Sequence, residues 1–351
     1  MNRGKGRVTL REVAAAASVS IVTASKALSG RMGTSHISEA CIQRVRAAAE
    51  QLGYQQNYLA SALRIGRSRT IGLSVGAYGF SMIGNIFWSP IAAGAEVTTR
   101  HRGYDLLLIG GTDLNEPVER GMRYMTSQRI DGLIVPQLMY SKIPTELENS
   151  TLPTVLIMGQ PRPGMSQVAF EDPPGIRDAV EHLAQLGHRR AVWIGLASAV
   201  DPHYQHRAQV FRESCQHHGM TGDILPLPGS FPTTHMVEHL IPALKQVTLP
   251  ADVTAVLCMN DGLALAALQV FPERGRRIPE DLSIIGFDDM FGDSSPCRLT
   301  TISHRLVDLG AAAANMVIAQ VEEAPAARKA QFVSLPSRLI IGRTTGPARL
   351  P

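Results

Sequence analysis

Cysteine is scarce in this sequence, and the few cysteines are scattered. Cys41, Cys215, Cys258 and Cys297 form no CxxC pair, so their spacing fits neither a disulfide framework nor a zinc site. No apolar run is long enough to span a bilayer, and the N-terminal MNRGKGRVTL is basic but has no apolar core. We therefore expect a protein of the reducing cytoplasm with no membrane partner.

Motifs of catalysis and nucleotide binding are also missing. The chain contains no GxSxG, Walker A or GxGxxG motif in a strand-turn-helix context, and no HExxH. His235 and His239 have the spacing of one helical face, but no cysteine accompanies them, so metal binding is disfavoured. The sequence thus predicts neither an enzyme nor a bound metal or cofactor.

The charge is unevenly distributed along the 351 residues, a length that suggests two or three domains. Residues 1–70 hold eleven Lys and Arg against three acids, a net charge of +8, whereas the whole chain carries only +4. A basic head on a mildly acidic body is typical of a nucleic-acid-binding module fused to another domain. A merely solvated basic face is the alternative.

Residues 8–28, VTLREVAAAASVSIVTASKAL, have the pattern of two short helices joined by a tight turn. Thr9 and Glu12 have the spacing of a capping box, which starts the first helix near Leu10. Ser20 is a good N-cap for the second helix. The pattern predicts a helix-turn-helix, and an alanine-rich hairpin in a plain bundle is the alternative.

The second of these helices carries an unusually apolar outward stripe. Ile21 and Val22 would be odd on a solvated surface, but in a major groove they can contact thymine methyl groups. Ser25 and Lys26, on the same side, suit phosphate oxygens or guanine edges. The stripe therefore indicates DNA.

A third helix and a marginal fourth follow. Ser38 predicts the start of a helix that Gly53 ends. The next segment, NYLASALRIGRSRT, is too short to be a stable helix alone and places Leu63 beside Arg64. It suits an element that folds on DNA and wedges a leucine into the minor groove. A flexible basic linker is the alternative.

Over nearly its whole length the chain resembles the LacI/GalR (lactose/galactose repressor) family of bacterial transcription regulators. The segments that carry the resemblance in the head are VTLREVAAAASVS, IVTASKAL, ISEACIQRVRAAAEQLGYQQN and LASAL. The resemblance implies DNA contacts from eleven residues: bases from Ile21, Val22 and Lys26, phosphates from Thr9, Ser20, Thr23, Ser25, Tyr54 and Asn57, and the wedge from Leu63 with Arg64.

Three positions of the head depart from the family pattern. Lys26 stands where arginine is usual, which weakens bidentate readout of guanine. Gln56 stands where proline is usual, and the loop at 30–37 is a few residues longer than in the family pattern.

From residue 70 short apolar runs alternate with helical segments, as in a buried parallel sheet. Two such series, the second starting with QVAFED near Gln167, predict two Rossmann-like doubly wound lobes of the periplasmic-binding-protein-like type. The expected domains are an all-α helix-turn-helix head at 1–56, a hinge helix and linker at 57–69, and an α/β effector-binding and dimerisation body at 70–351. Lobe 1 is expected at about 70–166 and 299–327, and lobe 2 at about 167–298 and 328–351.

Polar residues at strand ends mark a candidate effector site, because open α/β sheets bind ligands at the carboxyl ends of their strands. Asp172, Asn260 and Asp288 have this position, although such residues often simply cap the next helix. By resemblance, Arg207, Asn260 and Asp288 hydrogen-bond the effector. The same resemblance places Asn85, Phe87 and Trp88 on the wall of lobe 1 and makes Phe231 a stacking platform.

The chemistry of the effector stays open between a sugar, a sugar acid and a related metabolite. Met158 and Gly159 occupy the place where many sugar-responsive members carry an aspartate, so one acceptor for sugar hydroxyls is missing. Arg207 can pair equally with a carboxylate or a phosphate.

The sequence therefore predicts a transcriptional regulator, a repressor by resemblance, controlled by a small molecule between two lobes. We expect a homodimer on a pseudo-palindromic operator in double-stranded DNA, associated with the nucleoid when bound. The alternatives are a two-lobed small-molecule binding protein, which the basic head disfavours, and an α/β enzyme, which the missing motifs disfavour.

Overall fold

The structure is a computed structural model. It describes residues 8–29, 37–54, 66–75, 86–111, 113, 115–137, 143–196, 202–228, 237–291 and 297–349. The chain divides into two compact units, Met1–Ser68 and Arg69–Pro351, the head and the body. Five predicted site residues lie outside the described residues: Asn57, Leu63, Arg64, Asn85 and Phe231. Within the described ranges, no helix combines the length and apolar character that a bilayer span requires.

Three described helices build the head: α1 (Leu10–Ala16), α2 (Ile21–Ser29) and α3 (Glu39–Leu52). The capping box predicted for α1 is present, because Thr9 Oγ1 accepts from the amide of Glu12 and the Glu12 carboxylate accepts from the amide of Thr9. The amide of Thr23 donates to Ser20 Oγ at 3.0 Å, as expected of an N-cap. The sequence thus correctly predicted how both helices of the helix-turn-helix begin.

Small side chains allow the head helices to approach closely. Val13, Ala14, Ala17, Ala24 and Ala27 are buried together with residues of α3 in one apolar core. The polar contact of Arg44 Nε with the carbonyl of Ala17, at 3.0 Å, ties α3 to the turn between α1 and α2. The packing fixes which face of α2 stays outside.

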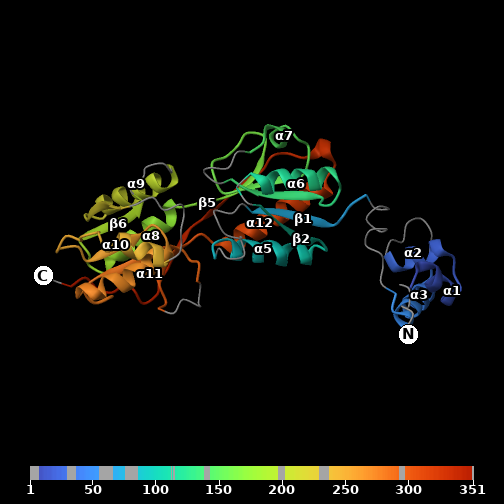
Figure 1. The fold of residues 1–351 in the computed structure, drawn as a ribbon, viewed down its shortest axis with the longest axis horizontal. Helices are drawn as coiled ribbons and strands as arrows, with labels where there is room; N and C mark the ends of the chain where they lie inside the picture. The colour runs from blue at the N-terminus through green and yellow to red at the C-terminus, as the bar shows by residue number, and fades with distance from the viewer. Residues whose placement is uncertain are drawn as a thin grey trace. The chain divides into compact units, whose positions relative to one another are not determined.

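The body has two lobes, each built on a six-stranded sheet (Figure 1). The sheet of lobe 1 is entirely parallel and runs in the order β11 (Phe332–Pro336), β5 (Ser166–Glu171), β4 (Thr154–Ile157), β3 (Gly132–Pro136), β1 (Thr70–Val75) and β2 (Asp105–Gly110). Helices α5 (Trp88–His101) and α12 (Leu306–Glu322) cover one face, and α6 (Glu116–Thr126) covers the other, near α7 (Thr145–Glu148).

The sheet of lobe 2 repeats this plan. It runs in the order β12 (Arg338–Ile340), β10 (Thr300–Ser303), β9 (Ser283–Asp288), β8 (Ala255–Cys258), β6 (Arg190–Leu196) and β7 (Thr221–Leu227), and only β12 is antiparallel. The helices pack in pairs, α8 (Pro173–Gln185) with α9 (Pro202–His217) and α10 (Val237–Leu244) with α11 (Asp261–Val270). Short 3₁₀ turns lie at Pro272–Arg274 and Pro325–Ala327.

The expected division of the chain between the lobes was wrong by one strand at each crossing. Residues 166–171 pair with β4 in lobe 1, although they were expected to open lobe 2, and residues 332–336 extend the same sheet. Residues 300–303 pair with β9 in lobe 2, although they were expected in lobe 1. Apolar runs identify buried strands, but they do not identify the sheet in which a strand pairs.

The chain therefore crosses between the lobes at three places. The crossings lie between β5 and α8 at Asp172, between β10 and α12 at His304, and between β11 and β12 at Ser337. All three lie beside the carboxyl ends of parallel strands, the edge where open α/β sheets bind ligands.

Two glycines allow α5 and α12 of lobe 1 to cross in direct backbone contact. A Cβ atom at Gly94 would lie 1.9 Å from the carbonyl oxygen of Val307, and one at Gly310 would lie 1.9 Å from that of Ile91. Because both oxygens belong to the backbone, the movement of a side chain cannot relieve such an overlap. The close crossing therefore requires glycine at both positions.

Candidate functional site

The head presents an apolar patch on its second helix. Ile21 and Val22 are 44% and 64% exposed, while Ala24 and Ala27 of the same helix are buried. Ser25 and Lys26 are half-buried beside the patch. The four side chains of the predicted outward stripe are therefore accessible, and two large apolar side chains in the first turn of α2 remain without cover within the head.

The predicted phosphate-binding residues lie at helix ends. Thr9 and Ser20 cap α1 and α2, and the hydroxyls of Ser20 and Thr23 lie 2.9 Å apart. Tyr54 follows α3 and packs against the head core. These residues have structural roles in the free head, and their phosphate contacts remain predictions.

In the body, Asp172 and Arg207 form a buried ion pair. Arg207 lies on α9, and its Nε donates to Asp172 Oδ2 at 2.7 Å. The guanidinium also lies over the ring of Phe287, 4.2 Å from its centroid. Asp172 precedes α8 but makes no side-chain cap hydrogen bond, so the simple capping interpretation does not hold for this residue.

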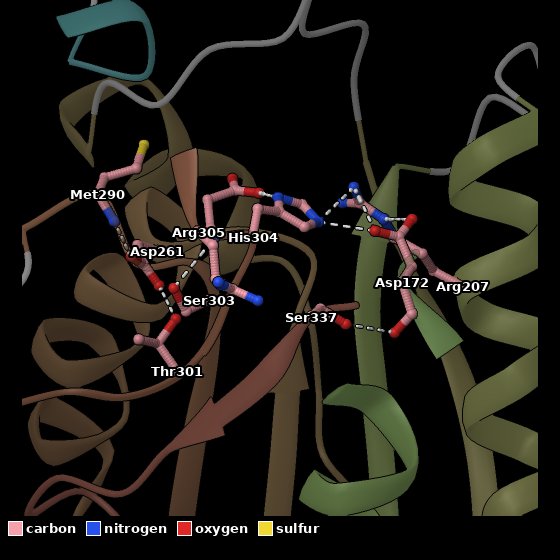
Figure 2. A network of polar contacts seen from close by, with 10 residues as sticks. Asp172, Arg207, Asp261, Met290, Thr301, Ser303, His304, Arg305 and Ser337 are labelled. Carbon is pink, nitrogen blue, oxygen red and sulfur yellow. Dashed lines mark hydrogen bonds and ion pairs between the residues drawn. The ribbon is translucent and has the colours of Figure 1, made fainter. Parts of the chain in front are cut away.

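His304 joins this pair from the second crossing (Figure 2). Its Nε2 lies 2.7 Å from Asp172 Oδ1, and its Nδ1 lies 3.1 Å from Asp288 Oδ1. The ring is stacked on Phe170 of β5 at a centroid distance of 4.0 Å. We call Asp172, Arg207, Asp288 and His304 the crossing cluster. Sequence reasoning missed His304, although it follows a strand just as Asn260 and Asp288 do.

The charges of the crossing cluster stabilise each other. Burial alone would raise the pKa of Asp172, but Arg207 and His304 outweigh it and hold that pKa well below its usual range. Burial alone would lower the pKa of His304, but the two carboxylates outweigh it and raise that pKa. With His304 protonated, two carboxylates face two cations, and the cluster carries no net charge.

Two residues with positive φ and Ser337 of the third crossing lie in or next to the crossing cluster. Asp288 has a φ of 99° and Asp289 a φ of 56°, conformations that cost energy for residues other than glycine and are frequent at functional sites. Ser337 Oγ donates to the carbonyl of Asp172 at 3.0 Å and accepts from the amide of Gly175. Each crossing thus contributes one residue to a connected polar network.

The side chain of Asn260 caps α11 through its oxygen but not through its nitrogen. Its Oδ1 accepts from the amide of Leu263 at 2.8 Å, which is the N-cap role that the alternative interpretation predicted for this residue. Its Nδ2 is buried and has no hydrogen-bond partner among the described residues. An unpaired buried amide is costly, so this donor suits a ligand or an ordered water.

The remaining predicted wall residues lie in lobe 1. Trp88 is buried in the apolar core between β1 and α12, and Phe87 beside it is half-buried. The two rings meet edge to face with centroids 5.5 Å apart. Met158 is buried as well, so it supplies packing where an aspartate would supply an acceptor. A contact of Phe87 or Trp88 with the effector remains a prediction.

Asp261 is a second buried carboxyl group at the edge of lobe 2. Thr301 Oγ1 donates to its Oδ1 at 2.5 Å, and the amide of Met290 donates to its Oδ2 at 2.9 Å (Figure 2). Burial raises the pKa of Asp261 to about 8, and the neighbouring charge of Asp288 adds to the effect. The group is therefore largely protonated at neutral pH.

The Asp261→Asn variant should remove a pH dependence of stability. Above pH 4 the carboxyl is ionised in the unfolded chain but protonated in the folded one, so the unfolded chain binds fewer protons and stability falls as pH rises to about 8. Asparagine mimics the protonated form. Urea denaturation measures the free energy of unfolding of both proteins. The value for Asp261→Asn minus that for the wild type should rise from pH 5 to 8 by at most about 1.4 kcal/mol per pH unit.

Asp252→Asn is the matched control. This aspartate is exposed and pairs with Arg190, which lowers its pKa, so its ionisation is complete in both states above pH 5. Its stability difference from the wild type should stay constant between pH 5 and 8. The same constancy in Asp261→Asn would show that Asp261 is ionised in the folded protein.

Comparison with known proteins agrees with both units. The family model of bacterial regulatory proteins, lacI family, matches residues 9–57, and a periplasmic binding protein-like domain matches residues 180–345. The chain is 30% identical to the HTH-type transcriptional repressor CytR of Escherichia coli K12 over 325 residues, 90% of each chain. The chain belongs to the LacI family of bacterial regulatory proteins. It is also 31% identical to the regulator CelR of Thermobifida fusca over 292 residues, 81% of this chain and 82% of CelR.

Solved structures show the LacI-family fold. The lac repressor dimer bound to operator and the anti-inducer ONPF matches with a TM-score of 0.70 at 24% identity, covering 97% of this chain and 99% of that chain. The CelR–cellobiose complex matches with a TM-score of 0.60 at 24% identity, covering 96% and 100%. The protein is therefore a DNA-binding transcriptional regulator with an effector-binding body, and the similar proteins named here are regulators rather than enzymes.

Proposed function

We propose that this LacI-family regulator represses transcription in the cytoplasm, as a homodimer on a pseudo-palindromic operator. A small, uncharged molecule rich in hydroxyl groups binds between its lobes and changes the affinity for the operator. The effector affects DNA binding only as far as it binds one lobe arrangement better than the other. The head reads DNA through the exposed stripe of α2, with Lys26 as a point charge that reads guanine less strictly than arginine.

The observation that carries the effector site is the unpaired donor of Asn260. Its buried Nδ2 lies at the start of α11, directly after β8, and Asp288 ends the neighbouring strand β9. Asn260 supplies a hydrogen-bond donor and Asp288 an acceptor, a combination that suits hydroxyl groups because each hydroxyl both donates and accepts.

The charge balance of the crossing cluster favours an uncharged effector over a sugar acid or phosphate. Arg207 already pairs with Asp172, and with His304 protonated the two carboxylates balance the two cations of the cluster. An anionic effector would have to displace Asp172 from Arg207 or stay unpaired near Asp288, and both cost free energy in a buried site. The bound sugars named for similar structures, cellobiose, ribose and xylulofuranose, are uncharged too.

The test is a thermal-shift screen of the full-length protein. The uncharged probes are cellobiose, D-ribose, D-xylulose, D-glucose and D-galactose, and the anionic probes are D-gluconate and ribose 5-phosphate. A ligand present at about 100 times its Kd stabilises the folded state by about 2.7 kcal/mol, which raises Tm by several degrees. We expect a Tm increase with an uncharged probe only. An increase with the anionic probes alone would contradict the proposal.

Asn260→Ser separates binding from folding. Serine is also a good N-cap, so α11 keeps its first hydrogen bond, but the amide donor is lost. We expect an unchanged Tm without ligand and about 10-fold weaker binding of the ligand found in the screen, the effect of one hydrogen bond. Unchanged affinity in this variant would place the effector elsewhere.

A further inference from the structure

His304 differs from Asp172, the other member of the crossing cluster that lies at a crossing, because its ring contacts aromatic rings of both lobes. It follows β10 of lobe 2 and precedes α12 of lobe 1, and its ring lies between Phe170 of lobe 1 and Phe287 of lobe 2. The ring is fully buried. A change in the angle between the lobes must therefore alter its surroundings.

The neighbours of the two ring nitrogens of His304 favour its charged form. Nε2 hydrogen-bonds Asp172 Oδ1 at 2.7 Å, and Nδ1 lies 3.1 Å from Asp288 Oδ1, close enough for an ion pair but without the geometry of a hydrogen bond. A neutral imidazole has one N–H and one acceptor, whereas the imidazolium has two N–H donors. The Nη2 atom of Arg207 is farther from Nε2, at 3.4 Å, so the contact at 2.7 Å with Asp172 decides the assignment.

We infer that His304 is a positioning residue of the proposed effector site: as a buried imidazolium it holds Asp172 and Asp288 in place and connects the effector-binding side chains to the lobe crossings. Asp172 in turn fixes Arg207 through Nε and is fixed by Ser337 of the third crossing. An effector that engages Asp288 or Arg207 therefore acts on all three crossings through one residue.

A single proton controls this arrangement. The charged and titratable groups around the ring are Asp172 at the start of α8, Arg207 and Tyr204 on α9, and Asp288 at the end of β9. Asp261 lies farther out, and the charges of Asp288 and Asp289 help to raise its pKa. Loss of the His304 proton leaves two carboxylates facing Arg207 alone, so the cluster gains a net negative charge and loosens.

The first experiment measures the protonation state. In the full-length protein labelled with ¹³C at histidine Cε1, the His304 resonance is identified by its absence in His304→Gln. We expect it to titrate above pH 6.5, the ordinary value for histidine, because the carboxylates outweigh burial. Titration at or below 6.5 would overturn the inference.

His188→Gln is the matched control. His188 is also buried, but among the described residues it contacts Thr254, Ser283 and the carbonyl of Gly346 and no carboxylate, and burial lowers its pKa. His304 stabilises the fold below pH 6.5 and loses this effect as pH rises through its raised pKa, whereas His188 loses its effect as pH falls below 6.5. The Tm difference between wild type and His304→Gln should therefore shrink from pH 6 to 9, and that for His188→Gln should shrink from pH 7 to 5.

Charge compensation separates positioning from packing. If His304 balances Asp288, then Asp288→Asn should recover part of the Tm that His304→Gln loses at pH 6, whereas Asp252→Asn at an exposed site should recover none. Equal effects of the two aspartate variants would contradict the inference. The inference rests on the proposed effector site, but these measurements need no effector, so an empty ligand screen with a raised His304 pKa would reject the proposed function alone.

Discussion

Asp172→Ala is expected to lower the free energy of unfolding by about 3–5 kcal/mol at pH 7, the cost of removing one partner from a buried ion pair. The carboxylate is the shared partner of Arg207 and His304, and it is the group that stabilises both cations inside the protein. Without it, two cations remain buried against the single carboxylate of Asp288. Urea denaturation of the full-length protein measures the loss.

Two further variants make this prediction specific. Asp223→Ala removes the partner of Arg190 at a half-exposed site, where solvent replaces the lost contact, and its effect should be much smaller. Replacing Asp172 with Asn and Arg207 with Met together removes the buried pair while keeping volume, so it should recover much of the stability. A loss of under 1 kcal/mol in Asp172→Ala would show that the cations are not stabilised by this carboxylate.

Local structure was the most predictable part of this fold. The capping box at Thr9, the N-cap at Ser20 and the stop at Gly53 depend on neighbours within a few residues, and the structure confirms all three. The buried strands were equally clear, since β1, β3, β8 and β9 are mostly apolar and are covered on both faces.

The crossings were the least predictable part, because they depend on pairing between distant segments. β5 and β11 lie more than 160 residues apart in sequence, yet they are neighbours in lobe 1. Residues 300–303 were assigned to the wrong lobe, so His304 was not considered for the candidate site. It follows a strand of lobe 2 at the same edge as Asn260 and Asp288. The sequence therefore singled out Asp172, Arg207 and Asp288 one by one, but it did not predict the His304 contacts that join them.

The contacts of Arg207 show why a residue type alone does not identify a ligand. From the sequence, this arginine suits an effector carboxylate, a phosphate or a sugar hydroxyl. In the fold it pairs with Asp172 and lies over Phe287, so part of its hydrogen-bonding capacity is used within the protein. Only three-dimensional proximity reveals such an internal partner.

Val22→Glu is expected to weaken specific DNA binding by a factor on the order of 100 or more. Among the described residues of the head, Val22 is the most exposed large apolar side chain, at 64%, and it lies in the first turn of α2. The substitution removes a methyl contact with a base, worth about 1–3 kcal/mol by analogy with a mismatched base pair, and it brings a carboxylate toward the phosphates. Binding is measured on a DNA site selected from genomic fragments with the wild-type protein.

The head itself should tolerate this change, because a glutamate in the first turn of a helix interacts favourably with the helix dipole. Ala47→Glu is the matched control: it adds the same charge at an exposed position of α3, outside the proposed contact stripe. It should weaken binding only slightly, and the effect should disappear at higher salt, as expected for a long-range charge. If both variants lose affinity equally, the effect is one of net charge, and the apolar stripe of α2 does not read the operator.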